Sequence, residues 1–156
     1  MKIQKRNNRE AVSAASNGPT VSGYAAVFNQ TTDLGRMLER IEPGAFDGAD
    51  MSDVRLLINH EGLPLARTAS GTMALLIDER GLKYVATLDA TEQAHTLASA
   101  ARRGDVSQSS FAFTIDRQRF EEQDGKPLRI IERVGKVLDV SPVTYPAYPG
   151  TEFKAK

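Results

Sequence analysis

The chain has 156 residues, 40% of them hydrophobic and 26% charged, which fits one globular domain with its own core. Its formal net charge at pH 7 is zero, so no global basic field favours binding of nucleic acid. Cysteine is absent, which excludes disulfides, thiolate zinc sites and a cysteine nucleophile, and no apolar run reaches the ~18 residues of a membrane span.

Polar residues dominate the start of the chain. Residues 1–20 are rich in Asn, Ser, Arg and Ala, which predicts a flexible arm ahead of the folded domain. We expect that domain at residues 21–151, followed by a short tail at residues 152–156.

Several segments of the expected domain alternate apolar with polar or small residues, or are short and apolar, as β-strands are. In chain order they are Val21–Phe28, Arg36–Ile41, Val54–Ile58, Met73–Ile77, Leu82–Leu88, Val106–Ile115 and Arg129–Leu138. Glu42–Phe46 predicts a turn into a short helix, because proline and glycine interrupt the strand pattern there. The clearest helix is predicted from Thr91, a good N-cap residue, to Arg103, just before Gly104.

Many short strands and one good helix predict a mainly β (α+β) fold. We expect a β-barrel, or a strongly curved sheet, that carries a few helices. The order of the strands does not follow from their periodicity.

The two histidines of the chain differ in their setting. His95 lies inside the predicted helix, where a surface residue is expected. His60 follows the apolar strand Val54–Ile58 and begins a loop, a place where a rigid scaffold can hold a catalytic group. The competing interpretation, which the pattern slightly favours, is a histidine that only caps the strand end by bonding the loop backbone.

Serines cluster in the segment Asp105–Phe113. If this segment is a strand, Ser110 faces away from Ser109 and from both neighbouring phenylalanines. Phe111 and Phe113 would then anchor one face in the core, and Ser110 would face a cleft. Serines that merely line an edge exposed to solvent are the alternative.

A serine hydroxyl attacks poorly unless a base removes its proton. Since cysteine is absent, Ser110 with His60 is the most economical catalytic pair, assembled in space rather than in sequence. Asp139 is the acidic residue that we choose to orient His60, because apolar strand residues flank it. An aspartate in this setting often makes a structural hydrogen bond instead.

Other chemistries lack support in the sequence. Two separate histidines without cysteine give no metal-ligand spacing, and no glycine-rich nucleotide-binding motif occurs. The Gly-x-Ser-x-Gly pattern of α/β-hydrolases is also missing. We therefore expect no metal and no cofactor.

Six motifs follow one another along the chain. They are Gly23–Asn29, Glu39–Phe46, Asn59–Glu61, Thr68–Thr72, Gly104–Phe113 and Val137–Pro149. In this order they closely resemble the phage prohead (capsid maturation) serine protease family, over about Val21 to Thr151. Each motif alone is weak, but six in order are specific.

The resemblance implies a fold related to the herpesvirus assemblin proteases, a closed β-barrel of six to seven strands surrounded by a few helices. It implies that Ser110 is the nucleophile, His60 the general base and Asp139 the third catalytic member. The chain departs from the family at Asp139, where glutamate is usual. It departs also at Ser109 and Ala112, where methionine and glycine are usual.

The implied function is that of a serine endopeptidase that cleaves the phage scaffold protein, or the N-terminal scaffold segment of the capsid protein, and itself. It would act in the bacterial host, inside the assembling prohead of a phage or prophage, without nucleic acid or membrane partners. Related viral proteases suggest a homodimer. The competing hypotheses are a non-catalytic β-barrel that binds capsid or scaffold, and a small esterase-like hydrolase.

Overall fold

The structure, a computed structural model, describes residues 17–156 and shows a mainly β protein with one helix among those residues. Residues 1–16, which make up most of the predicted arm, lie outside the described residues. The first strand begins at Thr20.

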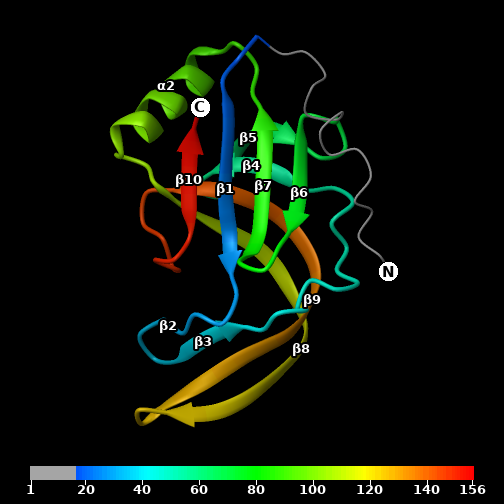
Figure 1. Ribbon diagram of the computed structural model, residues 1–156, viewed down its shortest axis with the longest axis vertical. Coiled ribbons are helices and arrows are strands. Elements are labelled where there is room, and N and C mark those ends of the chain that lie inside the picture. The colour runs from blue at the N-terminus through cyan, green and yellow to red at the C-terminus, as the bar shows by residue number, and fades with distance from the viewer. Residues whose placement is uncertain (1–16) are drawn as a thin grey trace.

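Four antiparallel strands form the first sheet, in the order β10-β1-β7-β6 (Figure 1). They are β1 (Thr20–Val27), β6 (Met73–Ile77), β7 (Gly81–Thr87) and β10 (Glu152–Ala155). Buried and half-buried residues alternate along β7 and most of β1, because successive side chains of a strand point to opposite faces. Residues 152–155, expected in a tail, form the edge strand β10.

Six strands form the second sheet, in the order β2-β3-β9-β4-β5, with β8 paired to β9. They are β2 (Thr32–Asp33), β3 (Leu38–Ile41), β4 (Arg55–Ile58), β5 (Glu61–Arg67), β8 (Gln108–Gln123) and β9 (Lys126–Val143). β9 runs parallel to β3 and β4 and antiparallel to β8. The long β8–β9 hairpin therefore extends past the first sheet and carries β2 and β3 beside it (Figure 1).

The helix α2 (Glu92–Arg103) begins and ends where its capping residues predict. The Thr91 side chain accepts a hydrogen bond from the Ala94 N–H, and Gly104 ends the helix with a left-handed φ of 83°. Ala94 and Leu97 are buried, and α2 packs beside β10 (Figure 1). Local signals were sufficient to predict this element.

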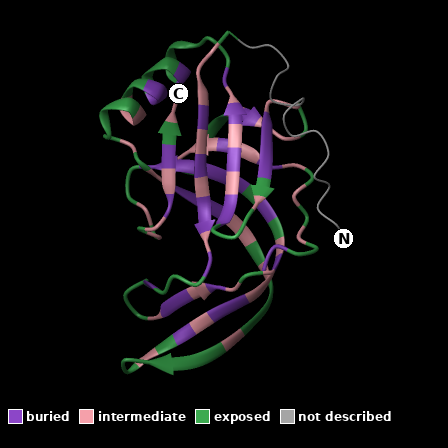
Figure 2. Cartoon of the chain, viewed as in Figure 1, coloured by how far each residue is buried: buried purple, intermediate pink, exposed green. Residues whose placement is uncertain are grey.

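The core lies between the two sheets, where the buried residues gather (Figure 2). Tyr84 and Phe153 of the first sheet stack with ring centroids 6.5 Å apart. Leu56 and Phe111 are buried on the inner face of the second sheet. The burial of these side chains supplies the main driving force that holds the sheets together.

The two sheets do not close into the six- to seven-stranded barrel with a few helices that the resemblance implied. Within residues 17–156, no ladder joins the edge strands β6 and β10 to the second sheet, and α2 is the one helix. The physical reason is that both edges of β9 are used within the second sheet, by β8 on one edge and by β3 and β4 on the other, so β9 offers no edge to the first sheet.

The short helix expected after Glu42–Phe46 is replaced by a series of turns. Ala45 N–H donates to Glu42 O and Asp47 N–H to Gly44 O, which are single turns rather than helical repeats. Gly44 and Gly48 have φ values of 87° and 79°, and this left-handed backbone interrupts a right-handed helix.

Candidate active site

Ser110 lies on β8, directly opposite Ser141 of β9. Its side chain is largely buried, with 9% of the residue exposed. Because strand residues alternate between faces, Ser110 shares one face with Ser141 and Asp139, whereas Ser109 shares the core face with Phe111.

Ser109 is held by structural hydrogen bonds. Its Oγ donates to the Glu152 carbonyl oxygen at 2.7 Å and lies 2.7 Å from the Tyr84 hydroxyl. Since the single Ser109 proton goes to Glu152, Tyr84 donates to Ser109. Burial raises the pKa of the Tyr84 hydroxyl above its usual range, so this donor stays protonated.

His60 lies over Asp139 because β4 runs parallel to β9. Arg55 of β4 pairs with Asp139, and the chain turns back after Ile58, which brings the His60 ring above β9. His60 Nδ1 lies 2.6 Å from Asp139 Oδ1. The Asp139 side chain is 10% exposed, whereas the His60 side chain is 36% exposed, so the aspartate is enclosed and the imidazole reaches solvent.

Ser141 belongs to the same cluster. Its Oγ donates to Asp139 Oδ1 at 2.8 Å and accepts the backbone N–H of His60 at 3.2 Å. No role for Ser141 was predicted from the sequence. Its spacing of two residues from Asp139 on one strand, which puts both side chains on one face, was the available signal.

Asn59 and His60 form the turn between β4 and β5. Their φ values are 53° and 60°, and Ile58 pairs with Glu61 across the turn. Two central residues with positive φ are the requirement of a type I′ hairpin turn, which favours Asn-Gly. Asn59 fits the first position, and His60 occupies the position that favours glycine.

The turn is also tied to the segment that follows β9. Asn59 N–H donates to the Pro142 carbonyl oxygen at 3.1 Å, and Thr144 N–H donates to Asn59 Oδ1 at 2.9 Å. Asn59 Nδ2 in turn donates to Thr144 Oγ1 at 3.2 Å. These bonds hold the backbone on which His60 sits.

The structure joins His60 and Asp139 directly, and it relates Ser110 to them through Ser141. The described residues show no hydrogen bond between the Ser110 hydroxyl and His60. Directly opposed strand residues have Cβ atoms roughly 5 Å apart, so Ser110 is a close neighbour of the cluster. His95 lies exposed on α2, as expected.

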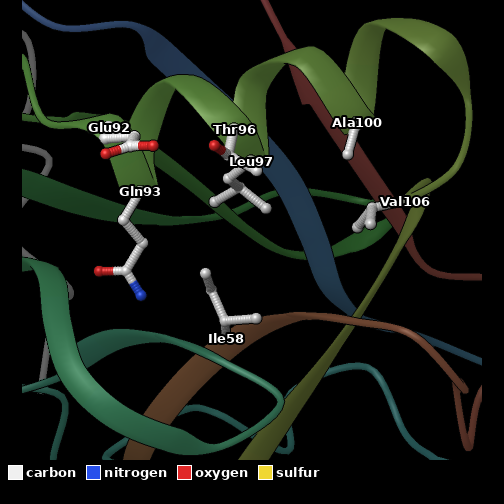
Figure 3. A pocket seen from close by; sticks show the side chains of 7 residues that line it. All are labelled: Ile58, Glu92, Gln93, Thr96, Leu97, Ala100 and Val106. Carbon is white, nitrogen blue, oxygen red and sulfur yellow. The ribbon is translucent and has the colours of Figure 1, made fainter.

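A groove of about 510 Å³ opens between α2 and the end of β4 (Figure 3). Its lining side chains are those of Ile58, Glu92, Gln93, Thr96, Leu97, Ala100 and Val106. Ile58 precedes the His60 turn by one residue, but neither Ser110, His60 nor Asp139 lines the groove. The groove thus adjoins the turn without containing the cluster.

In the part of the chain that the structure describes, no group of three or more His, Cys, Asp or Glu side chains could hold a metal ion. No helix of residues 17–156 is long and apolar enough to cross a membrane.

An imidazole held by an enclosed carboxylate, close to a serine on a neighbouring strand, is an arrangement that serine hydrolases use. The family model of the caudovirus prohead serine protease matches residues 4–156, and the chain belongs to this family. No curated protein and no solved structure matches the chain.

Proposed function

We propose that this protein is a capsid-maturation endopeptidase in which Ser110 is the nucleophile, His60 the general base and Asp139 the residue that orients His60. Family membership supports proteolysis by a serine in the prohead. The observation that carries the residue assignment is the 2.6 Å contact between His60 Nδ1 and Asp139 Oδ1. Ser110 pairs across the strands with Ser141, which lies two residues from Asp139 on β9.

In this proposal, Ser110 Oγ attacks the carbonyl carbon of a peptide bond while His60 Nε2 takes its proton. His60 returns that proton to the leaving amine as the C–N bond breaks and the acyl-enzyme forms. Water then attacks the acyl carbon, gives a proton to His60 and releases the acid, and Ser110 regains its proton. Asp139 keeps His60 in the tautomer that leaves Nε2 free as the acceptor.

Asp139 is one methylene shorter than the glutamate usual in the family. The short Nδ1–Oδ1 contact supports a role for the aspartate, because the turn after β4 brings His60 within reach of the shorter side chain. Ser109, which stands where the family usually has methionine, is a weaker candidate for the nucleophile than Ser110. Its side chain is fully buried and hydrogen-bonded to Tyr84 and Glu152.

The substrates that we propose are the phage scaffold protein, or the N-terminal scaffold segment of the capsid protein, and the protease's own ends. Cleavage would take place inside the assembling prohead in the bacterial host. The proposal includes a homodimer, so activity should rise more than proportionally with protein concentration.

The test is intact-mass analysis after treatment with a fluorophosphonate probe, which phosphonylates activated serines. Wild type and Ser109→Ala should be labelled, and Ser110→Ala should not. Ser109→Ala should lose about 1–3 kcal/mol of stability, because it leaves the buried Tyr84 hydroxyl without its partner. The same spectra report the termini, and Ser110→Ala should retain terminal residues that the wild type loses.

The other outcomes are equally informative. Loss of label in Ser109→Ala alone would move the nucleophile to Ser109. No label on any form, even at high concentration, would favour the non-catalytic module that binds capsid or scaffold. Turnover of simple esters without cleavage of scaffold peptides would favour the esterase-like hydrolase, and identical termini would count against self-cleavage.

A further inference from the structure

Ser141 is a buried polar side chain that the proton transfers above do not use. It is fully buried on β9, yet its hydroxyl makes two hydrogen bonds within the candidate site. The single Ser141 proton goes to Asp139 Oδ1, and an Oγ lone pair receives the His60 N–H. The Ser141 hydroxyl thus donates to the Asp139 carboxylate and accepts from the backbone of His60, the proposed base.

The three residues form a closed ring of hydrogen bonds. The His60 ring contacts Asp139 at 2.6 Å, Ser141 donates to the same carboxylate oxygen at 2.8 Å, and the His60 backbone donates to Ser141 at 3.2 Å. Ser141 therefore holds the backbone of His60 and the carboxylate that orients its ring at the same time. Rotation of the carboxylate would break two of the three bonds.

The position of Ser141 also relates this ring to the proposed nucleophile. Ser141 is the direct cross-strand partner of Ser110, and both side chains point to the same face. The bond to the His60 N–H matters most at this turn, because the His60 backbone has a φ of 60°, a value that non-glycine residues rarely adopt.

We propose that Ser141 is a positioning residue, which fixes the His60 imidazole and the Asp139 carboxylate relative to Ser110. This inference rests on the proposed function for its effect on rate. Its effect on the His60–Asp139 contact does not depend on catalysis. The alternative is that Ser141 only provides hydrogen-bond partners for buried polar groups. Its replacement would then change stability alone.

The experiment compares wild type with Ser141→Ala, Ser141→Thr and Ser109→Ala. Ser109→Ala is the matched control, because it removes a buried hydroxyl from the same strand pair on the opposite face. One readout is the fluorophosphonate labelling rate. The other is the downfield proton resonance of His60 Nδ1–H at low temperature, recorded also in a Ser110→Ala background.

We expect Ser141→Ala to slow labelling by about tenfold or more and to shift or broaden the Nδ1–H resonance. Ser109→Ala should leave the resonance unchanged, and Ser141→Thr, which keeps the hydroxyl, should stay near wild type in both readouts. If the added methyl of Ser141→Thr prevents folding, Ser141→Ala still tests the inference, because alanine adds no volume at this position.

A resonance that is unchanged in Ser141→Ala, whatever the loss of melting temperature, would overturn the inference. If the wild type is not labelled, the proposed function fails. The effect of Ser141→Ala on the His60 Nδ1–H resonance in the Ser110→Ala background then tests the positioning role of Ser141. A changed resonance there supports positioning of His60 by Ser141, and an unchanged one refutes it.

Discussion

The conformation of His60 is difficult to explain by stability. A residue with a Cβ atom in the left-handed region costs on the order of 1–2 kcal/mol, and asparagine tolerates this region better than histidine. Glycine at this position would form the same turn without the strain. Such strain persists mainly at functional positions, which favours a role for the imidazole.

Comparison of His60→Gly with His60→Ala separates strain from chemistry. Both variants lack the imidazole and should lose labelling by the fluorophosphonate probe. His60→Gly should be more stable than His60→Ala by about 1 kcal/mol, because alanine keeps the Cβ in the left-handed region. Urea denaturation monitored by circular dichroism measures the difference. If His60→Ala were as stable as His60→Gly or more stable, residue 60 would not hold this backbone conformation in solution.

At the residue scale, strand alternation predicted that Ser110 and Ser109 face opposite sides, and the structure places Ser109 in the core. The ring through Ser141 could not be predicted in this way. It depends on β4 lying beside β9, and these strands are far apart in the sequence.

Of the elements around the site, the strand β4 was predicted but its partner β5 was not. β5 contains Gly62 and Pro64, which are poor strand residues, and its first four residues are exposed. It forms a strand because β4 supplies the hydrogen bonds, with a register shift between Leu56 and Ile58. Pairing with a neighbour, rather than local preference, creates this element.

The open end of the β4–β5 hairpin is held by a charge cluster. Arg67 donates to both carboxylate oxygens of Asp53, at 2.7 and 2.8 Å, and Arg55 lies 3.4 Å from the same carboxylate. Arg55 and Arg67 are register partners on the two strands. The hydrogen bond from Arg67 holds the pKa of Asp53 below its ordinary value of 3.8.

Asp53→Asn should therefore lower the melting temperature in a pH-dependent way. A carboxyl whose pKa is lower in the folded state contributes stability that is complete above the unfolded pKa. That stability is lost as pH falls through the folded value. The difference between wild type and Asp53→Asn should be full at neutral pH and shrink below the ordinary value of 3.8. Thermal melts from neutral pH down to about 2.5 measure it.

Arg67→Lys is the control for this prediction. It keeps the charge but not the two-pronged geometry, and it should fall between wild type and Asp53→Asn at neutral pH. A difference between wild type and Asp53→Asn that stays constant with pH would assign the effect to packing rather than to charge.

At the scale of the whole molecule, the mainly β class and the helix α2 were predictable, because both depend on local periodicity and capping. The arrangement of the sheets was not. β9 pairs with β3 and β4, which lie far from it in the sequence, and such long-range pairing leaves no local signal. The strand β10 was overlooked for the same reason, because its formation depends on β1, more than a hundred residues earlier.

β10 connects the two sheets at the start of β8. It pairs with β1 in the first sheet, and Phe153 N–H donates to the Ser107 carbonyl oxygen at 2.8 Å, just before β8 begins. The Glu152 carbonyl oxygen accepts the Ser109 hydroxyl. The chain's last strand therefore holds the segment that leads into Ser110.

Phe153→Ala should show how far the site depends on this connection. Phe153 is 2% exposed and stacks on Tyr84, so its removal should destabilise the protein by about 3–5 kcal/mol. It should also slow fluorophosphonate labelling at a temperature where the variant is still folded, because the start of β8 loses support. Lys154→Ala is the control: its side chain is 68% exposed and should change stability by less than about 0.5 kcal/mol. Normal labelling by a folded but destabilised Phe153→Ala would mean that β8 and β9 hold Ser110 in place without β10.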